Sequence, residues 1–259
     1  MRHFRSALVT AACALVAAGC SDGVTDPSLK TLSLPQLLPE HNDLRAELQD
    51  IVNQDNGGLG FEMWATILDR DGIVVDVVFS GVLSTDQWPG SRVISAQKAN
   101  TGNAFSLENF ALSSANLYAP VQPGGSLFGL QESNPVDPNV AYGGKASDFG
   151  TRKDFMIGKR IGGINVFGGG LGLYTTTGEL IGGIGLSGDT SCTDHIIAWK
   201  LRHALNLDNV PAGVGEGNTD NIIFSPDATL DGFEHPRCDE GAVAIAEDLP
   251  EDFPVGSAP

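Results

Sequence analysis

The residues best able to do chemistry gather around one glycine-rich turn late in the chain. Residues 183–188 lead into a predicted helix that carries Asp194 and His195, and Asp189 and Thr190 stand at its start. A helix start offers free backbone N–H groups and the positive end of the helix dipole, so this turn suits a carboxylate or a phosphate. A tight strand-to-helix turn that binds nothing would have the same composition.

His195 is the candidate metal ligand of this turn. No two of the histidines have the spacing of a preformed zinc site. His195 and His203 stand eight residues apart, hence roughly on one face of the predicted helix. The functional interpretation makes His195 a ligand to iron in a flat macrocycle. The structural interpretation makes both histidines surface or packed residues of an amphipathic helix.

Three other motifs are weaker. Residues 183–188 match the dinucleotide fingerprint, with Asp208 twenty residues further on. Their strand belongs to a predicted hairpin, however, and no apolar parallel strand follows the helix. Ser187 is not in a nucleophile-elbow motif, so serine hydrolase chemistry is not indicated. Oxygen-bearing side chains alternate over residues 216–220, a faint calcium-like pattern that lacks the terminal bidentate glutamate.

The amino terminus has the pattern of a bacterial lipoprotein signal. A short basic segment precedes an apolar run over residues 7–18, which is too short for a membrane span but suits a signal peptide. Small residues and Gly19 then precede Cys20, as in a lipobox. We therefore expect residues 1–20 to be removed up to a lipidated Cys20, and residues 21–40 to form a linker. Ser21 favours the outer membrane if the host is Gram-negative. The alternative to lipidation is ordinary cleavage of the signal peptide.

Two cysteines remain after this processing. Cys13 is lost with the signal and Cys20 carries lipid, which leaves Cys192 and Cys238 in an oxidising compartment. We expect them to form a disulfide, which would stabilise the fold by about 3–4 kcal/mol. The alternative is a reactive Cys192 thiolate at the helix start.

Composition and periodicity set the fold class. The 259 residues carry a net charge of −17, which argues against nucleic acid as a partner, and 41% are hydrophobic, enough for a core. The pattern predicts a helix capped by Asn42, a hairpin over 64–79, a helix capped by Ser91, a shorter helix near Ser106, a hairpin over 171–184, and a helix over 193–205 capped by Thr190 or Ser191. This order implies an α+β domain with a central antiparallel sheet, built from two hairpins and flanked by helices.

Two segments lie outside this regular pattern. Residues 119–161 are rich in Pro and Gly and read as a long ordered insertion. Residues 207–259 form an acidic extension, expected to be a solvated surface and tail tied back by the disulfide. The central domain is expected to span residues 41–206.

Several stretches resemble one known family. The glycine-rich residues 168–171 and 178–189, together with residues 96–105, are similar to the GlcG/HbpS-like family, also called the haem-degrading domain family. The resemblance covers about residues 41–206. It implies an α+β domain, commonly assembled into oligomers, that in some members binds haem or iron and in some turns haem over slowly by oxidation. The family has no fixed iron ligand, so the choice of His195 rests on the residues alone.

These observations lead to one hypothesis and two alternatives. The hypothesis is an exported, lipid-anchored protein that binds haem (heme) or another tetrapyrrole, more a binding protein than an enzyme, and a homo-oligomer. Its expected site comprises Gly169, Gly170, Asp189, Thr190, Asp194 and His195, with Arg152 from a basic run meeting the propionates. The alternatives are an oligomeric interaction module without a ligand and a binder of small organic acids at the same helix start.

Overall fold

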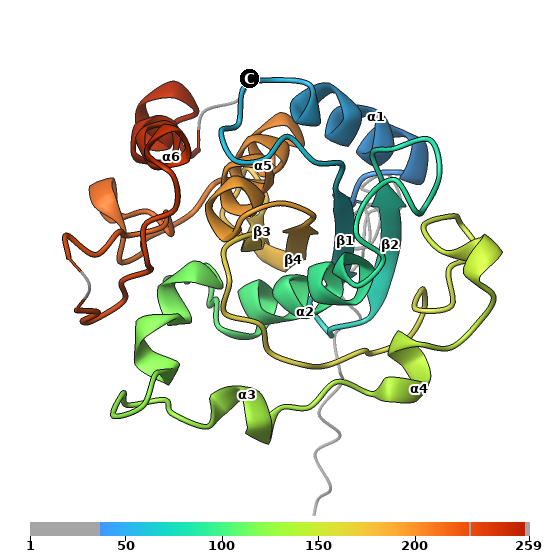
Figure 1. Cartoon of the computed structure of the whole chain (residues 1–259), viewed down its shortest axis with the longest axis horizontal. Coiled ribbons are helices and arrows are strands. Elements are labelled where there is room, and N and C mark those ends of the chain that lie inside the picture. Colours follow the sequence, from blue (N-terminus) through green and yellow to red (C-terminus); the bar gives the residue numbers. More distant parts are fainter. Residues whose placement is uncertain (1–36, 228, 257–259) are drawn as a thin grey trace, which may run out of the picture. The chain divides into compact units, whose positions relative to one another are not determined.

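Four antiparallel strands form one sheet in the order β2-β1-β4-β3 (Figure 1). The computed structural model describes residues 37–227 and 229–256. The strands are β1 (Trp64–Asp69), β2 (Val74–Phe79), β3 (Gly170–Tyr174) and β4 (Leu180–Ser187). Each hairpin supplies two adjacent strands, and the hairpins join where β1 pairs with β4. This arrangement confirms the α+β prediction and its sheet of two hairpins.

Left-handed glycines close both hairpins. Gly72 has a φ of +77° and donates its N–H to Asp69 O at 2.9 Å. Gly178 has a φ of +81° and donates to Thr175 O at 2.8 Å. Glycine adopts this backbone without the steric cost that a Cβ would add. The turn residues read from the sequence therefore set the positions of the strands.

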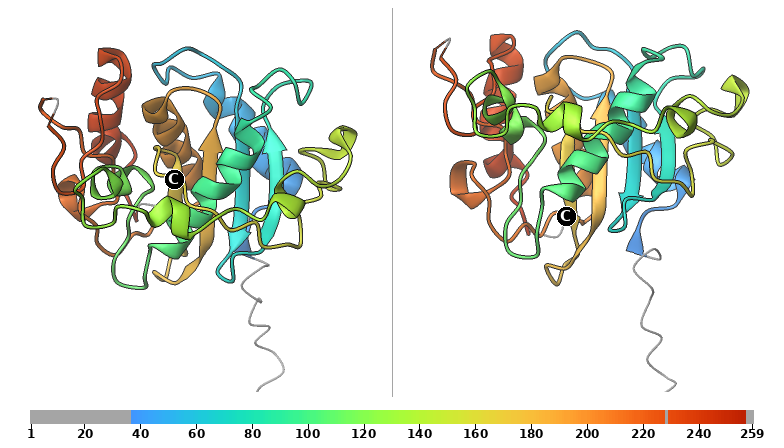
Figure 2. Two further views of the ribbon diagram at one scale, coloured as in Figure 1. Left: turned by 60° about the horizontal axis from the view of Figure 1, so that its bottom comes forward. Right: turned by 90° about the horizontal axis from the view of Figure 1, so that it is seen from below.

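Helices cover both faces of the sheet, with α2 (Ser91–Ala104) on one face and α1 (His41–Val52) and α5 (Ser191–Ala204) on the other (Figures 1 and 2). A further helix, α6 (Glu240–Asp252), packs against α5. The remaining helical segments of the described residues are short: α3 (Leu130–Ser133), α4 (Pro138–Ala141) and 3-10 turns at Ala115–Leu117, Ala119–Val121, Ala146–Asp148 and Glu216–Asn218.

Two predicted helix caps are wrong, and one predicted helix is not formed. Helix α1 starts at His41, one residue before the predicted cap Asn42. Ser91 is the first residue of α2 rather than its cap. No helix starts near Ser106, because Leu107 and Phe110 bridge to each other and close a tight turn there. A short polar stretch does not reveal such local backbone pairing.

Glycines in β4 let α2 lie directly on the sheet. A Cβ added at Gly185 would lie 1.9 Å from Ser95 O of α2, which is well inside contact distance. The close backbone approach predicted for the glycine-rich hairpin is therefore confirmed. On the other face, side chains of α1 and α5 fill the core together with Ile67 of β1 and Ile184 of β4. The helix residues of this core include Leu44, Leu48, Ile51, Ile196, Ile197 and Trp199.

The irregular segment 119–161 is held against α2 by buried contacts. Arg92 of α2 donates from Nε to Asp154 Oδ2 at 2.8 Å, and it also donates to Ala141 O at 2.8 Å. Met156 is fully buried in the same cluster as Trp64. A buried, hydrogen-bonded ion pair thus orders a stretch that has little secondary structure of its own.

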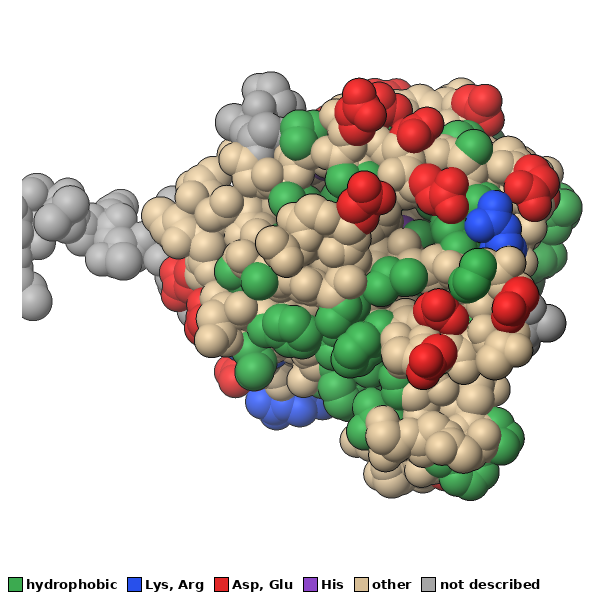
Figure 3. All heavy atoms as spheres, turned by 90° about the vertical axis from the view of Figure 1, so that its left-hand side faces the viewer, with side chains coloured by type: hydrophobic (Ala, Val, Ile, Leu, Met, Phe, Trp, Pro, Cys, Tyr) green, Lys and Arg blue, Asp and Glu red, His purple; other side chains and the backbone are tan. Residues whose placement is uncertain are grey.

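The acidic extension contains a packed helix, which the sequence analysis missed. The apolar face of α6 is buried, with Ala242, Val243, Ala246 and Leu249 turned inward. Trp199 Nε1 of α5 donates to Phe253 O at 3.0 Å just beyond α6. Figure 3 views this side of the molecule, where acidic side chains stand around an apolar band. The acidic residues are the solvent face of an amphipathic helix rather than a solvated tail.

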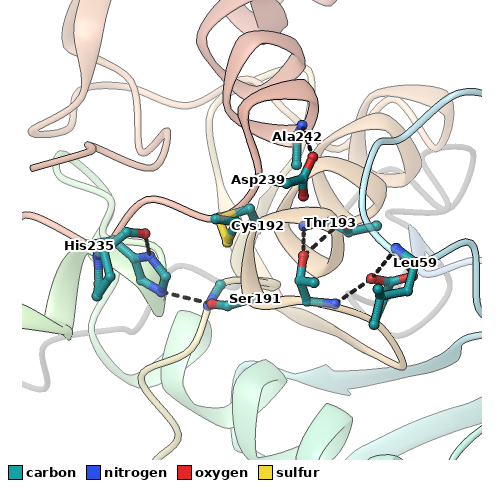
Figure 4. The surroundings of a disulfide bond; sticks show 12 residues. Leu59, Ser191, Cys192, Thr193, His235, Asp239 and Ala242 are labelled. Carbon is teal, nitrogen blue, oxygen red and sulfur yellow. Dashed lines mark hydrogen bonds between the residues drawn. A yellow bond between two sulfur atoms is a disulfide. The ribbon is translucent and has the colours of Figure 1, made fainter.

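The predicted disulfide joins the C-terminal extension to the central domain. Cys192 of α5 and Cys238 ahead of α6 are bonded, with a Cα–Cα distance of 6.2 Å (Figure 4). Asp239 follows the bond and caps α6 by accepting from Ala242 N–H at 2.9 Å. The start of α6 is therefore fixed to the start of α5.

Candidate functional site

An ion pair lies at the centre of the turn between β4 and α5. Lys98 Nζ of α2 lies 2.5 Å from Asp194 Oδ2 of α5, and both side chains are almost fully buried. Lys98 Nζ also donates to Leu186 O at 3.1 Å. An ammonium has three N–H donors, so one of them has no acceptor among the described residues.

The second oxygen of Asp194 organises the turn. Oδ1 accepts from the backbone N–H groups of Gly188 at 3.1 Å and Asp189 at 2.9 Å. Burial raises the pKa of Asp194 to about 6, although the Lys98 charge and these hydrogen bonds oppose the rise. Burial also lowers the pKa of Lys98. The pair is thus held by geometry in an environment that disfavours both charges.

The ion pair forms the floor of an open groove of about 280 Å³. The groove is lined mostly by apolar atoms, and its apolar walls are Trp88, Ile94 and Phe167. Its other lining residues are Ser91, Lys98, Ser187, Asp189, Ser191 and Asp194. A concave, largely apolar site with a few convergent polar groups is the usual form of a small-molecule site, and this volume is at the small end of that range. Other clefts on the described surface are larger, but polar atoms predominate in their linings.

Asp189 positions one wall of the groove. Its carboxylate accepts from the backbone N–H groups of Leu59 at 3.0 Å and Phe61 at 3.0 Å. The half-exposed Phe61 ring then packs edge-on against Trp88, with ring centroids 5.2 Å apart. The aromatic wall therefore extends beyond the groove onto the surface.

Thr190, Gly169 and Gly170 shape the site without facing a ligand. Thr190 caps α5 by accepting from Thr193 N–H, as predicted. Gly169 has a φ of +112°, and a Cβ there would lie 2.6 Å from Leu186 O. Gly170 starts β3 against the backbone of Lys98. These residues hold the strand and helix ends close together.

The structure places His195 in the core and not in the groove. Its side chain is fully buried, and Nε2 lies 3.0 Å from Asn221 Oδ1. Its Nδ1 has no hydrogen-bond partner among the described residues, and His195 is not among the residues that line the groove. Burial lowers the pKa of His195 to about 4. In this arrangement neither imidazole nitrogen is accessible to an iron bound in the groove.

Arg152 lies on a different surface. It faces Glu40 at 3.6 Å and, with Lys153 and His41, lines a shallow surface cleft. Lys159 and Arg160, the other members of the predicted basic run, contact Phe155 O and Asp71 O. The fold therefore does not bring the basic run to the groove.

Two further sequence patterns have structural roles. Asp220 of the calcium-like pattern accepts two hydrogen bonds from Arg202, at 2.6 and 2.8 Å, in a fully buried pair. His41 and His203 pair with Asp76 and Asp208 at 2.7 and 2.8 Å. No group of three or more His, Cys, Asp or Glu residues that could hold a metal ion occurs in the described part of the chain.

Sequence reasoning missed most of the groove. Lys98 lies within residues 96–105, which resemble the family, but the sequence does not predict a role for it. Trp88 and Phe167 carry no local signal. The sequence around Lys98 gives no clue to its burial, because Gln97 and Asn100 beside it are polar. That the partner is Asp194, 96 residues away, is a property of the fold.

Comparisons with known proteins agree with this fold. A family model described as "Haem degrading protein HbpS-like" matches residues 46–201. One similar solved structure is the Klebsiella pneumoniae protein ORFY, assigned to DUF336, at 21% identity and a TM-score of 0.43 over 63% of this chain and 86% of that one. Another is PduOC in complex with haem, at 23% identity and a TM-score of 0.47 over 67% of this chain and 98% of that one. No curated protein matches the chain.

The described helices include none long and apolar enough to cross a bilayer. Cys20 and the predicted signal peptide lie outside the described residues. Because the family model covers more than half of the chain, and the hairpins, helices and glycine-rich turn form one domain over that range, the chain belongs to the HbpS-like family.

Proposed function

We propose that this protein binds haem, or a similar flat tetrapyrrole, in the groove between Trp88 and Phe167, and that lipid on Cys20 holds it at the outer membrane after export. The observation that carries the proposal is the groove itself, whose apolar lining surrounds a buried lysine. Lys98 has two acceptors within the part of the chain that the structure describes, which leaves one of its three N–H donors for a ligand. Membership of the HbpS-like family supports haem as the first ligand to test.

The groove suits two parts of a haem molecule. Trp88, Ile94 and Phe167 offer apolar surface to the macrocycle, and Phe61 extends that surface. The third N–H of Lys98 can donate to one carboxylate oxygen of the ligand. At about 280 Å³ the groove takes part of the ligand and leaves the rest exposed.

The groove offers no protein ligand to iron. None of its lining side chains is an imidazole, a thiol, a thioether or a phenol. When bound, haem would supply an iron centre for redox chemistry, and the role of the described residues is to hold the macrocycle and to orient one carboxylate. We therefore assign haem binding, and no haem turnover, to the groove.

The test is a haemin titration of residues 21–259, followed by the Soret band. Trp88→Ala removes an aromatic wall that is half exposed, so the fold should tolerate it. We expect a saturable one-to-one change in the native protein and a Kd about tenfold higher in Trp88→Ala. Phe128→Ala, an exposed aromatic that does not line the groove, is the matched control and should bind like the native protein.

Two results would contradict the proposal. One is the absence of a saturable Soret change in the native protein, and the other is equal affinity in Trp88→Ala. His195→Gln should bind normally, because His195 does not line the groove. A loss of binding in His195→Gln alone, with the fold intact, would restore His195 as the ligand and move the site into the core.

A small organic acid is the second candidate, and the free N–H of Lys98 favours it. If haemin does not bind, calorimetric titration with aliphatic and aromatic carboxylates tests this reading directly. We expect the affinity to be lost in Lys98→Met and retained in Lys153→Met, which removes an exposed lysine from a different surface.

Export and anchoring are tested separately. In a detergent phase-separation experiment, the exported protein should partition into the detergent phase. Mass spectrometry of its N-terminal peptide should show lipid at Cys20. The homo-oligomer expected from the family resemblance is also part of the proposal, and sedimentation of the detergent-free domain measures it. A monomeric domain would contradict that part alone.

A further inference from the structure

A serine and a histidine from distant parts of the chain meet at the edge of the groove. Ser191 is the first residue of α5, is partly exposed and lines the groove. His235 comes from the C-terminal extension, 44 residues later, and is buried. Ser191 Oγ lies 2.8 Å from His235 Nε2, and Figure 4 shows the two side chains pointing toward each other.

The hydrogen bonds around this pair define its proton positions. His235 Nδ1 lies 2.7 Å from Pro236 O. A carbonyl oxygen only accepts, so Nδ1 carries the proton and Nε2 is left as an acceptor. Ser191 therefore donates its hydroxyl proton to Nε2, and its Oγ in turn accepts from Gly168 N–H at 2.7 Å.

The imidazole is neutral, so its Nε2 lone pair can accept the serine proton, although its low pKa makes it a weak base. Burial lowers the pKa of His235 to about 4, and the positive charge of Lys98 contributes in the same direction. The Tyr118 ring packs edge-on against the imidazole at 4.9 Å between centroids. A neutral base in hydrogen-bond contact with a hydroxyl is the arrangement that activates a serine nucleophile.

Covalent structure holds the pair in place. Cys192 follows Ser191 directly, and its disulfide partner Cys238 stands three residues after His235. The bond therefore fixes the histidine-bearing loop to the start of α5 (Figure 4). The disulfide thus limits how far the backbones that carry the two residues can separate.

Backbone donors lie beside the serine. The N–H groups of Ser191 and Cys192 are in the first turn of α5 and have no acceptor among the described residues. Backbone N–H groups of the nucleophile and of the residue after it are common oxyanion donors in acyl transfer. Nucleophile, base and donors thus meet at one edge of an apolar groove.

We propose that Ser191 and His235 form a nucleophile and general base that cleave carboxylic esters with an apolar acyl group. Ser191 Oγ attacks the ester carbonyl carbon while His235 Nε2 takes the hydroxyl proton. The tetrahedral intermediate expels the alcohol, which receives that proton, and leaves an acyl ester on Ser191. Water then attacks the acyl carbon with His235 as the base, releasing the carboxylic acid and restoring the serine. This activity needs no haem, although haem bound in the same groove would compete with the ester.

The test uses an alkyl fluorophosphonate on the full-length protein without haemin, followed by intact and peptide mass spectrometry. We expect one adduct per chain, located on Ser191, and none in Ser191→Ala. His235→Gln should slow labelling at least about 100-fold, the usual contribution of a general base. Ser126→Ala is the matched control, since Ser126 is an exposed serine that lines a different cleft, and the variant should react at the native rate.

Turnover is measured with p-nitrophenyl acetate and butyrate. We expect slow hydrolysis, because a base of low pKa activates the serine weakly. An initial burst of p-nitrophenol should mark accumulation of the acyl-enzyme. Near-ultraviolet circular dichroism and the mass of the intact disulfide establish that each variant is folded. The proposal is overturned if the native protein forms no adduct, if the adduct is on another residue, or if folded His235→Gln reacts at the native rate.

Discussion

His195 and His235 are the titratable residues whose burial makes the fold sensitive to acid. Burial lowers the pKa of each from 6.5 to about 4. A lowered folded-state pKa contributes stability above pH 6.5, and that contribution is lost as the pH falls toward 4. Asp194 acts in the opposite sense, because its raised pKa contributes stability that is lost as the pH rises from about 4 to about 6.

His195→Gln isolates one of these contributions. Glutamine can still donate to Asn221 Oδ1 but does not titrate. The native protein should lose about 3 kcal/mol more stability than the variant between pH 7 and pH 4, since each pKa unit corresponds to 1.36 kcal/mol. Urea unfolding at the two pH values measures the difference. Equal losses in the two proteins would show that the pKa of His195 is the same in the folded and the unfolded chain, which would contradict the prediction.

Lys98 and Asp194 are coupled, and each needs the other. Lys98→Met leaves the carboxylate buried without its cation, which should cost about 3–5 kcal/mol. In Lys98→Met/Asp194→Asn the amide oxygen still accepts from Gly188 and Asp189 without carrying a charge. We expect the double variant to be more stable than Lys98→Met in urea unfolding. A double variant at least as unstable as the sum of both single changes would disprove the coupling.

At the scale of elements, the contact between α2 and β4 depends on missing side chains. Gly185→Ala places a Cβ 1.9 Å from Ser95 O, so the helix must move away from the sheet. We expect a loss of about 3 kcal/mol or more. Gly90→Ala is the control, because Gly90 has a helical φ of −65° and open space around it. Thermal unfolding of both variants tests the claim, which fails if they are equally stable.

At the scale of elements, the disulfide links α5 to the residues just ahead of α6. Replacing Cys192 and Cys238 by serine frees a 46-residue separation and should reduce the free energy of unfolding by about 3–4 kcal/mol. The same change should loosen His235 and raise hydrogen exchange in α6 before it affects the sheet. Protection in α6 that matches the native protein would show that packing alone holds the extension.

At the scale of the whole molecule, the net charge does not draw the protein to a membrane surface. The net charge of −17 gives the surface no general attraction to anionic lipid or nucleic acid. In our proposal, membrane attachment therefore depends on lipid at Cys20. Expressed with its signal in a Gram-negative host, the native protein should sediment with the outer membrane, and Cys20→Ala should remain soluble in the periplasm. A soluble native protein would contradict lipidation.

The sequence predicted the elements better than the site. Both hairpins and the three helices that cover the sheet follow from local periodicity and turn glycines, which act over a few residues. The helix α6 was missed because its many acids outweighed the short apolar pattern of Ala242, Val243, Ala246 and Leu249. Of the predicted site residues, Asp189 and Asp194 line the groove, whereas His195 and Arg152 do not.

The sequence by itself determined the α+β class, the family and the pairing of Cys192 with Cys238, because each depends on local patterns or on a count of cysteines. Only the tertiary structure brought Lys98 to Asp194 and Ser191 to His235, across 96 and 44 residues. It also placed His195 in the core, since the side of a helix that faces a cavity depends on what packs against it. Hydrophobic periodicity identifies a buried face but does not distinguish the core from a groove.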